Sequence, residues 1–327
     1  MTEIEKQLAQ IFMPHAMSEF DRMRRSGGRF AHYTSADTGL NILRSERVFL
    51  RNSTLMNDFS EVHHGLNCLR FAYNGPSGER LKVALRAVQN DLPEILEANF
   101  NDKLLDFCSE TYLMSISEQG IGHEDKFGRL SMWRAYAPKN GVAFILNNTP
   151  FVGESNALNA FTSPVIYAMP EDFQPAFLEV VESIEKNIGV LQQLGGKNVH
   201  DRLMNAFRFA IQSIKHPAFK EEREWRVIYS PTLLPDSPEF WQVQASRIPS
   251  EIMSLGGVPQ RVHTIPFQDY PDEGFIGATL PDLVDRVLIG PSQDSYAIRE
   301  AYVAELTRLG VRDAYLKVAI TGIPLRH

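Results

Sequence analysis

The chain contains a charged stretch that runs directly into a strand-like one, Lys220-Glu221-Glu222-Arg223-Glu224-Trp225-Arg226-Val227-Ile228-Tyr229. Alternation along a β-strand puts Glu222, Glu224 and Arg226 on one face and the apolar and aromatic side chains on the other. That first face is ionic, and buried carboxylates without partners are costly. If the strand lies inside the fold, these side chains form a site. If it lies at a sheet edge, they are a solvated face.

Composition indicates an ordinary globular protein. The chain has 327 residues, of which 43% are hydrophobic, and this is ample for a core. Its formal net charge of -7 does not favour a broad surface for binding duplex DNA. Cys68 and Cys108 are the two cysteines, and their distant spacing indicates a reducing compartment. The polar N-terminus and the lack of a long apolar run predict a cytoplasmic protein that does not bind a membrane.

The order of the predicted elements indicates an α+β fold with a mixed central β-sheet and flanking and inserted helices. Apolar runs predict strands near residues 29–34, 48–50, 112–117 and 141–146. The run at 141–146 is almost continuously apolar, which is typical of a central strand covered on both sides. Residues 231–280 are rich in Pro and Gly, and we expect one further strand there, at 263–267.

No repeat or low-complexity linker divides the chain, so we expect residues 1–327 to form a single domain. Residues 1–28 read as an N-terminal helix that ends at a pair of glycines. Residues 74–106 and 170–216 read as helical insertions, with Pro93 splitting or kinking the first. Residues 285–320 read as a C-terminal βαβ-like unit.

Several polar side chains stand at strand ends or on one strand face, where a ligand can meet them. His32, Tyr33 and Thr34 end the first predicted strand and offer an imidazole and hydroxyls. Ser115 and Ser117 share one face of their strand. Two further candidates are Arg51, as a clamp for phosphate or carboxylate, and Tyr136, as a ring for stacking. Each also has a purely structural interpretation, as a core or surface residue.

A cluster of potential metal ligands follows the second predicted strand: Asn57, Asp58, Glu61, His63 and His64. Adjacent histidines diverge by about 100° on a helix, and no second cluster is spaced to match, so we expect no metal site. The chain also lacks the glycine-rich nucleotide-binding motifs and the Gly-x-Ser-x-Gly motif. A Rossmann dehydrogenase, a P-loop hydrolase and an α/β-hydrolase are therefore disfavoured.

In several segments along nearly its whole length, the chain resembles the bacterial domain-of-unknown-function family 2971. The resembling segments are His32-Tyr33-Thr34-Ser35 with Leu40, Ile42 and Leu43, Asn57-Asp58, Ser115-Ile116-Ser117-Glu118, Trp133-Arg134-Ala135-Tyr136, Gly141-Val142-Ala143, Lys215 with Glu222-Arg223-Glu224-Trp225-Arg226, Ile289-Gly290-Pro291, and Ile323-Pro324-Leu325-Arg326. This family implies no established activity.

More distantly, the chain is similar to ADP-ribosyltransferases. One branch of these enzymes surrounds NAD with a first-strand arginine, a Ser-x-Ser strand and a Glu-x-Glu motif, and another branch uses a histidine, a tyrosine and a glutamate. Here His32, Ser115-Ile116-Ser117 and Glu222-Arg223-Glu224 occur in a compatible order. The chain departs from the first branch because His32 stands where arginine is expected, and Arg51 comes one strand later.

That resemblance implies an enzyme that cleaves NAD and transfers ADP-ribose to a protein or nucleic-acid acceptor, as a toxin or phage-defence effector. Glu224 would stabilise the oxocarbenium-like cation that develops when the nicotinamide–ribose bond breaks. Glu222 would orient or deprotonate the acceptor, and His32 would hold a ribose hydroxyl. Ser115 would support the nicotinamide, Tyr136 would stack on a ring, and Arg51 would neutralise the pyrophosphate.

Three other interpretations stay open. In one, the Glu222, Glu224 and Arg226 side chains pair with one another and with Arg134 in a structural ionic network. In the second, the protein is a non-catalytic sensor that binds a nucleotide, a nucleic-acid end or a phage component in the same cleft. In the third, it is a metal-dependent nuclease built on Asp58, Glu61 and His63.

Overall fold

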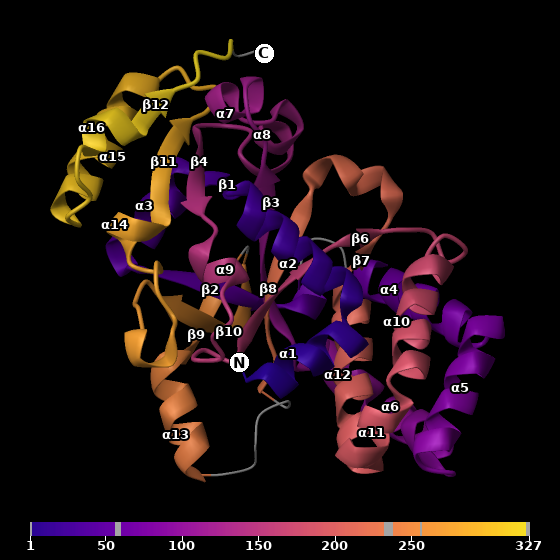
Figure 1. Cartoon of the computed structure of the whole chain (residues 1–327). Helices are drawn as coiled ribbons and strands as arrows, with labels where there is room; N and C mark the ends of the chain where they lie inside the picture. Colours follow the sequence, from indigo (N-terminus) through magenta and orange to yellow (C-terminus); the bar gives the residue numbers. More distant parts are fainter. Residues whose placement is uncertain (1, 56–59, 232–237, 256, 325–327) are drawn as a thin grey trace.

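The computed structural model describes residues 2–55, 60–231, 238–255 and 257–324. Figure 1 shows a central sheet with most of the helices gathered on one side of it and the C-terminal elements on the other. The predicted α+β class with a mixed central sheet and flanking helices is confirmed. No helix in the described ranges is long and apolar enough to cross a membrane.

Among the described residues, ten strands form the main sheet, and two short strands form a second one. The strands of the main sheet are β1 (Arg29–Ser35), β2 (Arg47–Asn52), β3 (Tyr112–Gln119), β4 (Gly141–Asn147), β5 (Ala160–Pro164), β8 (Glu224–Tyr229), β9 (Ser250–Leu255), β10 (Val258–Pro266), β11 (Val284–Ile289) and β12 (Val318–Ile320). Their order is β12-β11-β4-β1-β3-β2-β10-β9, and β8 lies between β3 and β5. The pairs are antiparallel except for β11 with β12. The second sheet pairs β6 (Ile166–Tyr167) with β7 (Ile214–Lys215) in parallel.

The helices fall into a larger helical region and shorter segments beside the sheet. The helical region contains α1 (Glu3–Phe12), α2 (Pro14–Ser26), α4 (Ser60–Tyr73), α5 (Pro76–Val88), α6 (Leu92–Ser109), α10 (Gln174–Lys186), α11 (Ile188–Leu194) and α12 (Gly196–Ser213). The remainder are α3 (Ala36–Ser45), α7 (His123–Phe127), α8 (Leu130–Tyr136), α9 (Thr149–Val152), α13 (Pro238–Arg247), α14 (Leu280–Leu283), α15 (Ser295–Arg308) and α16 (Ala314–Lys317), with 3₁₀ turns η1 (Ser53–Leu55), η2 (Pro217–Glu222) and η4 (Pro271–Glu273).

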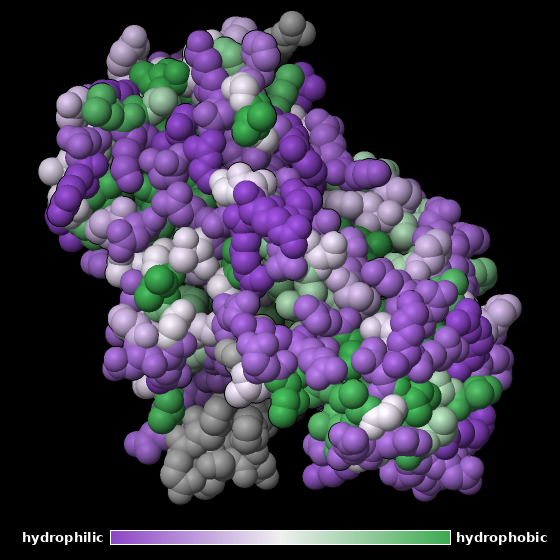
Figure 2. Space-filling model, viewed as in Figure 1, coloured by the Kyte–Doolittle hydropathy of each residue, from purple (hydrophilic) through white to green (hydrophobic). Residues whose placement is uncertain are grey.

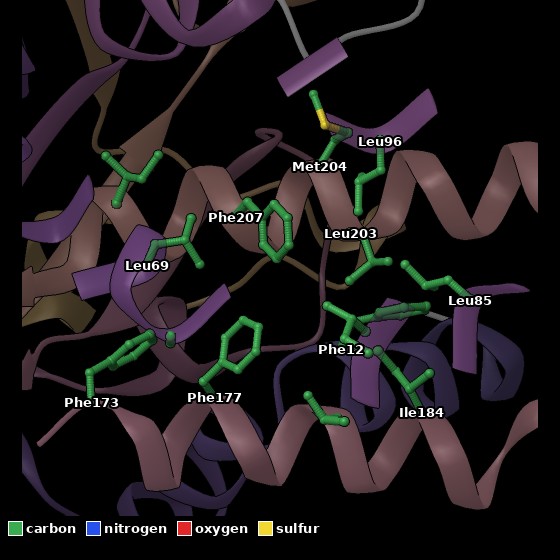
Figure 3. Packing of buried hydrophobic residues seen from close by; sticks show 14 of the residues in the cluster. Phe12, Leu69, Leu85, Leu96, Phe173, Phe177, Ile184, Leu203, Met204 and Phe207 are labelled. Carbon is green, nitrogen blue, oxygen red and sulfur yellow. The ribbon is translucent and has the colours of Figure 1, made fainter. Parts of the chain in front are cut away.

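The helical region has a hydrophobic core of its own, separate from the cores on the sheet. Figure 3 shows its centre, where Phe177 and Ile184 of α10, with Phe173 at the N-cap of that helix, face Leu203 and other apolar side chains of α12. Helices from both predicted insertions pack together there, since α10 contacts α5 and α12 contacts α6. Hydrophilic residues cover most of the face seen in Figure 2, with hydrophobic ones gathered over this region.

Several local expectations need correction. The predicted N-terminal helix is two helices, because Pro14 begins α2 at a position where its missing N–H costs nothing. The expected split near Pro93 is confirmed, since Pro93 lies in the first turn of α6. Where one strand was expected near 263–267, two strands, β9 and β10, pair as an antiparallel hairpin. Because β9 is paired on one side only, its residues are half-exposed and carry little apolar signal.

Candidate functional site

The site lies where the main sheet splits. One edge of β3 pairs with β8 from Tyr112 to Ser117. The other edge pairs with β1 only from Ser117 onward and with β2 only at Tyr112 and Leu113. Because β1 and β2 meet β3 at opposite ends, residues 114–116 have no strand partner on that edge within the described registers. This leaves a gap in the sheet between β1 and β2.

A pocket of about 370 Å³ opens at this gap. Its lining includes each of the nine residues predicted from the sequence: His32, Tyr33, Thr34, Arg51, Ser115, Ser117, Tyr136, Glu222 and Glu224. These residues come from β1, β2, β3, α8, η2 and β8, which are distant in sequence. The fold therefore brings all the candidates around one cavity, which we call the ionic pocket. Their chemical roles stay predictions.

Glu224 is the buried centre of the ionic pocket. It begins β8, which lies inside the sheet between β3 and β5, so the strand is not a solvated edge. Its Oε1 accepts hydrogen bonds from Ser115 Oγ at 2.5 Å and from Arg226 Nε at 2.8 Å. Burial acts to raise the pKa of Glu224, but the charges of Arg226 and Lys215 and the Ser115 hydrogen bond lower it to about 2. This carboxyl is ionised at neutral pH.

Lys215 and Glu61 complete a network of five charged side chains. Lys215 Nζ lies 2.9 Å from Glu61 Oε1, 2.7 Å from Glu222 Oε2 and 3.1 Å from Glu224 Oε2. Glu61 Oε2 also pairs with Arg226 Nη2 at 2.5 Å. Burial acts to lower the pKa of Lys215, yet Glu224 and Glu61 raise it above its ordinary value. Three carboxylates thus surround two buried cations, and each cation is held in its charged form.

Sequence reasoning placed neither Lys215 nor Glu61 in this pocket. Lys215 was noted only within the family resemblance, and Glu61 only as a metal ligand. The residues before Lys215, Ile211-Gln212-Ser213-Ile214, mix apolar and polar types, so the sequence carries little local signal that this lysine is buried with partners. Arg134, expected to join the network, is exposed and forms no ion pair with these side chains in the described structure.

Glu222 lines the pocket from a different secondary-structure element than the sequence predicts. It ends the 3₁₀ turn η2 and does not belong to β8, because Arg223 takes a left-handed conformation with φ 45° that breaks the extended chain. Glu222 therefore does not lie on a strand face with Glu224 and Arg226, and the prediction from alternation is wrong for this residue. Its carboxylate joins the network through Lys215, and its Oε1 accepts a hydrogen bond from Tyr136 Oη at 2.9 Å. Burial of the hydroxyl, and then Glu222, raise the pKa of Tyr136.

His32 and Tyr33 point to opposite faces of the sheet. His32 is the cross-strand partner of Phe144, in the apolar core on the far face, whereas Tyr33 is the partner of Ala143 on the face of the ionic pocket. His32 borders the pocket only because it fills the gap, where its Nδ1 lies 3.2 Å from the carbonyl oxygen of Ser115. Burial lowers the pKa of His32, against the effect of that carbonyl. His32 is accordingly neutral at pH 7.

Arg129 holds the backbone that carries the two predicted glutamates. It is buried, and its Nη2 donates to the carbonyl of Glu118 at 2.8 Å and to Glu124 Oε1 at 2.6 Å. Its Nη1 donates to Ser117 Oγ at 3.0 Å and to the carbonyl of Glu221 at 2.5 Å. Ser117 Oγ in turn donates to the carbonyl of Glu222. Ser117 therefore supports the turn before β8 and offers no free hydroxyl to a ligand.

Arg51 belongs to β2, which pairs with the edge of β3 opposite to β8. Its Nη2 donates to the carbonyl of Leu55 at 2.8 Å. The buried Nε of Arg51 has no hydrogen-bond partner in the described residues. A ligand oxygen is the kind of partner that such a donor lacks.

The described residues do not favour the metal interpretation. Asp58 and Asn57 lie outside the described residues, the Glu61 carboxylate is taken by Lys215 and Arg226, and His64 Nε2 lies 2.8 Å from the carbonyl of Ala168. Within the described ranges, no group of three or more His, Cys, Asp and Glu side chains is placed to hold a metal ion. A metal-dependent nuclease therefore gains no support here.

Comparison with known proteins agrees with the resemblance in the sequence. Residues 132–227 match the family model of a protein of unknown function, DUF2971. The DUF2971 match runs from α8 through β8, so it includes Tyr136, Lys215, Glu222, Glu224 and Arg226. No curated protein and no solved structure shows a significant match. The DUF2971 description assigns no activity, so a function has to be argued from the pocket.

Proposed function

We propose that the protein is an ADP-ribosyltransferase-like enzyme, which cleaves the nicotinamide–ribose bond of NAD and transfers ADP-ribose to a macromolecular acceptor. One observation carries this proposal. The segments that resemble ADP-ribosyltransferases, around His32, Ser115 and Glu224, line a single pocket, and Ser115 donates a hydrogen bond to Glu224.

The electrostatics of the pocket suit this chemistry. Breaking a glycosidic bond develops positive charge on the sugar, and a fixed carboxylate nearby stabilises that charge. Glu224 is ionised, buried and held by Ser115, Lys215 and Arg226, so it needs no reorganisation during the reaction. In this role Ser115 orients Glu224, which differs from the support of nicotinamide that the resemblance implies.

The remaining residues take roles that fit their positions. Glu222 is less buried than Glu224 and lies beside Tyr136, where it would meet an acceptor. Tyr136 is 38% exposed and offers a ring for stacking. Arg51 would pair with the pyrophosphate through its unpartnered Nε. His32 is neutral and donates its Nδ1–H to the Ser115 carbonyl, so its Nε2 would accept a hydrogen bond from a ribose hydroxyl.

A direct test follows NAD turnover. The purified chain is incubated with NAD, and released nicotinamide is measured by chromatography. We expect Glu224→Gln to lower the rate by at least 100-fold, because the neutral amide stabilises the cation poorly. Glu221→Gln is the matched control. Glu221 lies three positions before Glu224, is exposed, and does not line the pocket. If wild type neither binds NAD nor releases nicotinamide, the proposal is wrong.

One observation favours a second candidate, a non-catalytic module that binds a nucleotide or a phage component. Both oxygens of Glu224 already have partners, as Oε1 has Ser115 and Arg226, and Oε2 has Lys215 and Arg226. A carboxylate whose two oxygens both have hydrogen-bonding or ionic partners is typical of a structural network. NAD binding by calorimetry that persists in Glu224→Gln, without nicotinamide release by either protein, would favour this module.

A further inference from the structure

A second cavity lies behind the gap in the sheet, on the face opposite the ionic pocket. It measures about 90 Å³, and His32 and Thr162 are the only polar residues among the described ones that line it. The rest of its wall is apolar and comes mainly from α3, β2, β3, β4, α9, β5, β8 and β10 and from the segment 275–284. We call it the apolar cavity.

The two cavities meet at the gap between β1 and β2. Four residues line both: His32, Ile42, Val48 and Met114. In the gap, no described strand pairs with residues 114–116 on the edge of β3 that faces β1 and β2, so side chains rather than paired backbone divide the cavities. Met114 is flexible by nature, and His32 is held across the gap through the Ser115 carbonyl at 3.2 Å.

We propose that the ligand of the ionic pocket carries a short unbranched alkyl group, which passes between His32 and Met114 into the apolar cavity. This goes beyond the proposed function and holds for any ligand whose polar end lies in the ionic pocket. NAD has no alkyl chain, so in an ADP-ribosyltransferase the group belongs to the acceptor.

The size and chemistry of the apolar cavity select this occupant. An apolar cavity of about 150 Å³ binds benzene and stays free of water. The present volume is smaller, so a narrow chain fits better than a ring. With two polar lining residues, it gives a water molecule few partners. An empty cavity also costs stability, so an alkyl chain that fills it gains both burial and contacts.

The test uses the full chain labelled with ¹³C at the methionine methyl groups, and normal alcohols from 1-propanol to 1-hexanol as probes. The Met114 methyl reports on the gap, Met132 lines only the ionic pocket, and the exposed Met169 reports on neither. We expect saturable shifts at Met114 and Met132 and none at Met169. Affinity rises about fourfold for each added methylene and levels off when the cavity is full.

Matched variants then distinguish alcohol binding in the apolar cavity from nonspecific effects of the alcohol on the protein. Ala278 lines the apolar cavity, and we expect Ala278→Leu to fill it and to weaken 1-hexanol binding at least tenfold. Ala304→Leu, on the exposed face of α15, leaves binding unchanged. If Ala278→Leu does not fold, Leu283→Phe fills the same cavity. The dependence of affinity on alcohol chain length is measured on the wild-type protein and needs neither variant.

Three results would each overturn the proposal. Shifts that grow linearly with alcohol concentration indicate no site. An affinity independent of chain length, or equal in Ala278→Leu and wild type, shows that the chain does not enter the apolar cavity. Saturable shifts at Met114 without any at Met132 show that the cavity binds the alcohol but is not joined to the ionic pocket.

Discussion

Lys215 Nζ lies 3.1 Å from Glu224 Oε2, and this contact joins the residue that ends β7 to the residue that begins β8. Both side chains are buried, with Lys215 4% and Glu224 6% exposed. The pair therefore links the small β6–β7 sheet to the main sheet at the ionic pocket. Its partners, Glu61, Glu222 and Arg226, make it the centre of the charged network.

Replacing Lys215 tests how far the network depends on this cation. Lys215→Met removes one of two cations among three carboxylates, and we expect it to lower the free energy of unfolding by about 3–5 kcal/mol. The measurement is urea denaturation followed by circular dichroism. Lys220→Met is the matched control, since Lys220 is exposed in the turn η2 that follows β7, and it should change stability by less than about 0.5 kcal/mol. Equal effects of the two variants would contradict a central role for Lys215.

The hydroxyl of Ser115 should contribute to the stability of the folded protein. Ser115→Ala removes a donor to Glu224 Oε1, and we expect a loss of about 1–3 kcal/mol of stability because the acceptor is a buried charge. Ser131→Ala is a suitable control, because the buried Ser131 hydroxyl has no hydrogen-bond partner in the described structure. Thermal unfolding of both variants gives the comparison. A Ser115→Ala protein as stable as wild type would show that the hydrogen bond contributes nothing.

Stability should fall in acid with a contribution from Glu224. Its pKa is about 2 when folded, below the ordinary 4.5, so the folded state binds the proton less readily than the unfolded state. The associated stability is complete above about pH 4.5 and is lost as the pH falls towards 2, by about 3 kcal/mol in all. Urea unfolding of wild type between pH 3 and 6 measures it. In Glu224→Gln this part of the slope disappears, and an unchanged slope would contradict the assignment.

Replacing glycine by alanine should have opposite effects on stability at Gly290 and Gly189. A Cβ at Gly290 would meet the Trp133 ring at 2.7 Å, so Gly290→Ala should displace α8, which carries Tyr136, and cost about 1–3 kcal/mol. A Cβ at Gly189 in α11 meets no atom within 4 Å, so Gly189→Ala should stabilise by about 0.5–1 kcal/mol. Calorimetric melting temperatures that move the same way in both variants would argue against this packing of α8.

Local patterns were sufficient to find most of the strands that build the pocket. The apolar run at 141–146 predicts β4, whose residues up to Leu146 are buried between β1 and β11. Pairing of small polar residues on one face predicts the orientation of Ser115 and Ser117 on β3. Hairpin β9–β10 was largely missed, because β9 lies at the sheet edge and its half-exposed residues carry a weak periodic signal.

The sequence by itself determined the α+β class, the ionic character of β8 and the choice of nine candidate residues. These follow from periodicity and residue type, which act over a few positions. Only the tertiary structure decided that Lys215 and Glu61 join Glu224 and Arg226, and that Glu222 enters from a turn. It also decided that His32 fills a gap in the sheet. Such contacts join residues far apart in the chain, and burial forces each buried charge to find whichever partner the fold brings near.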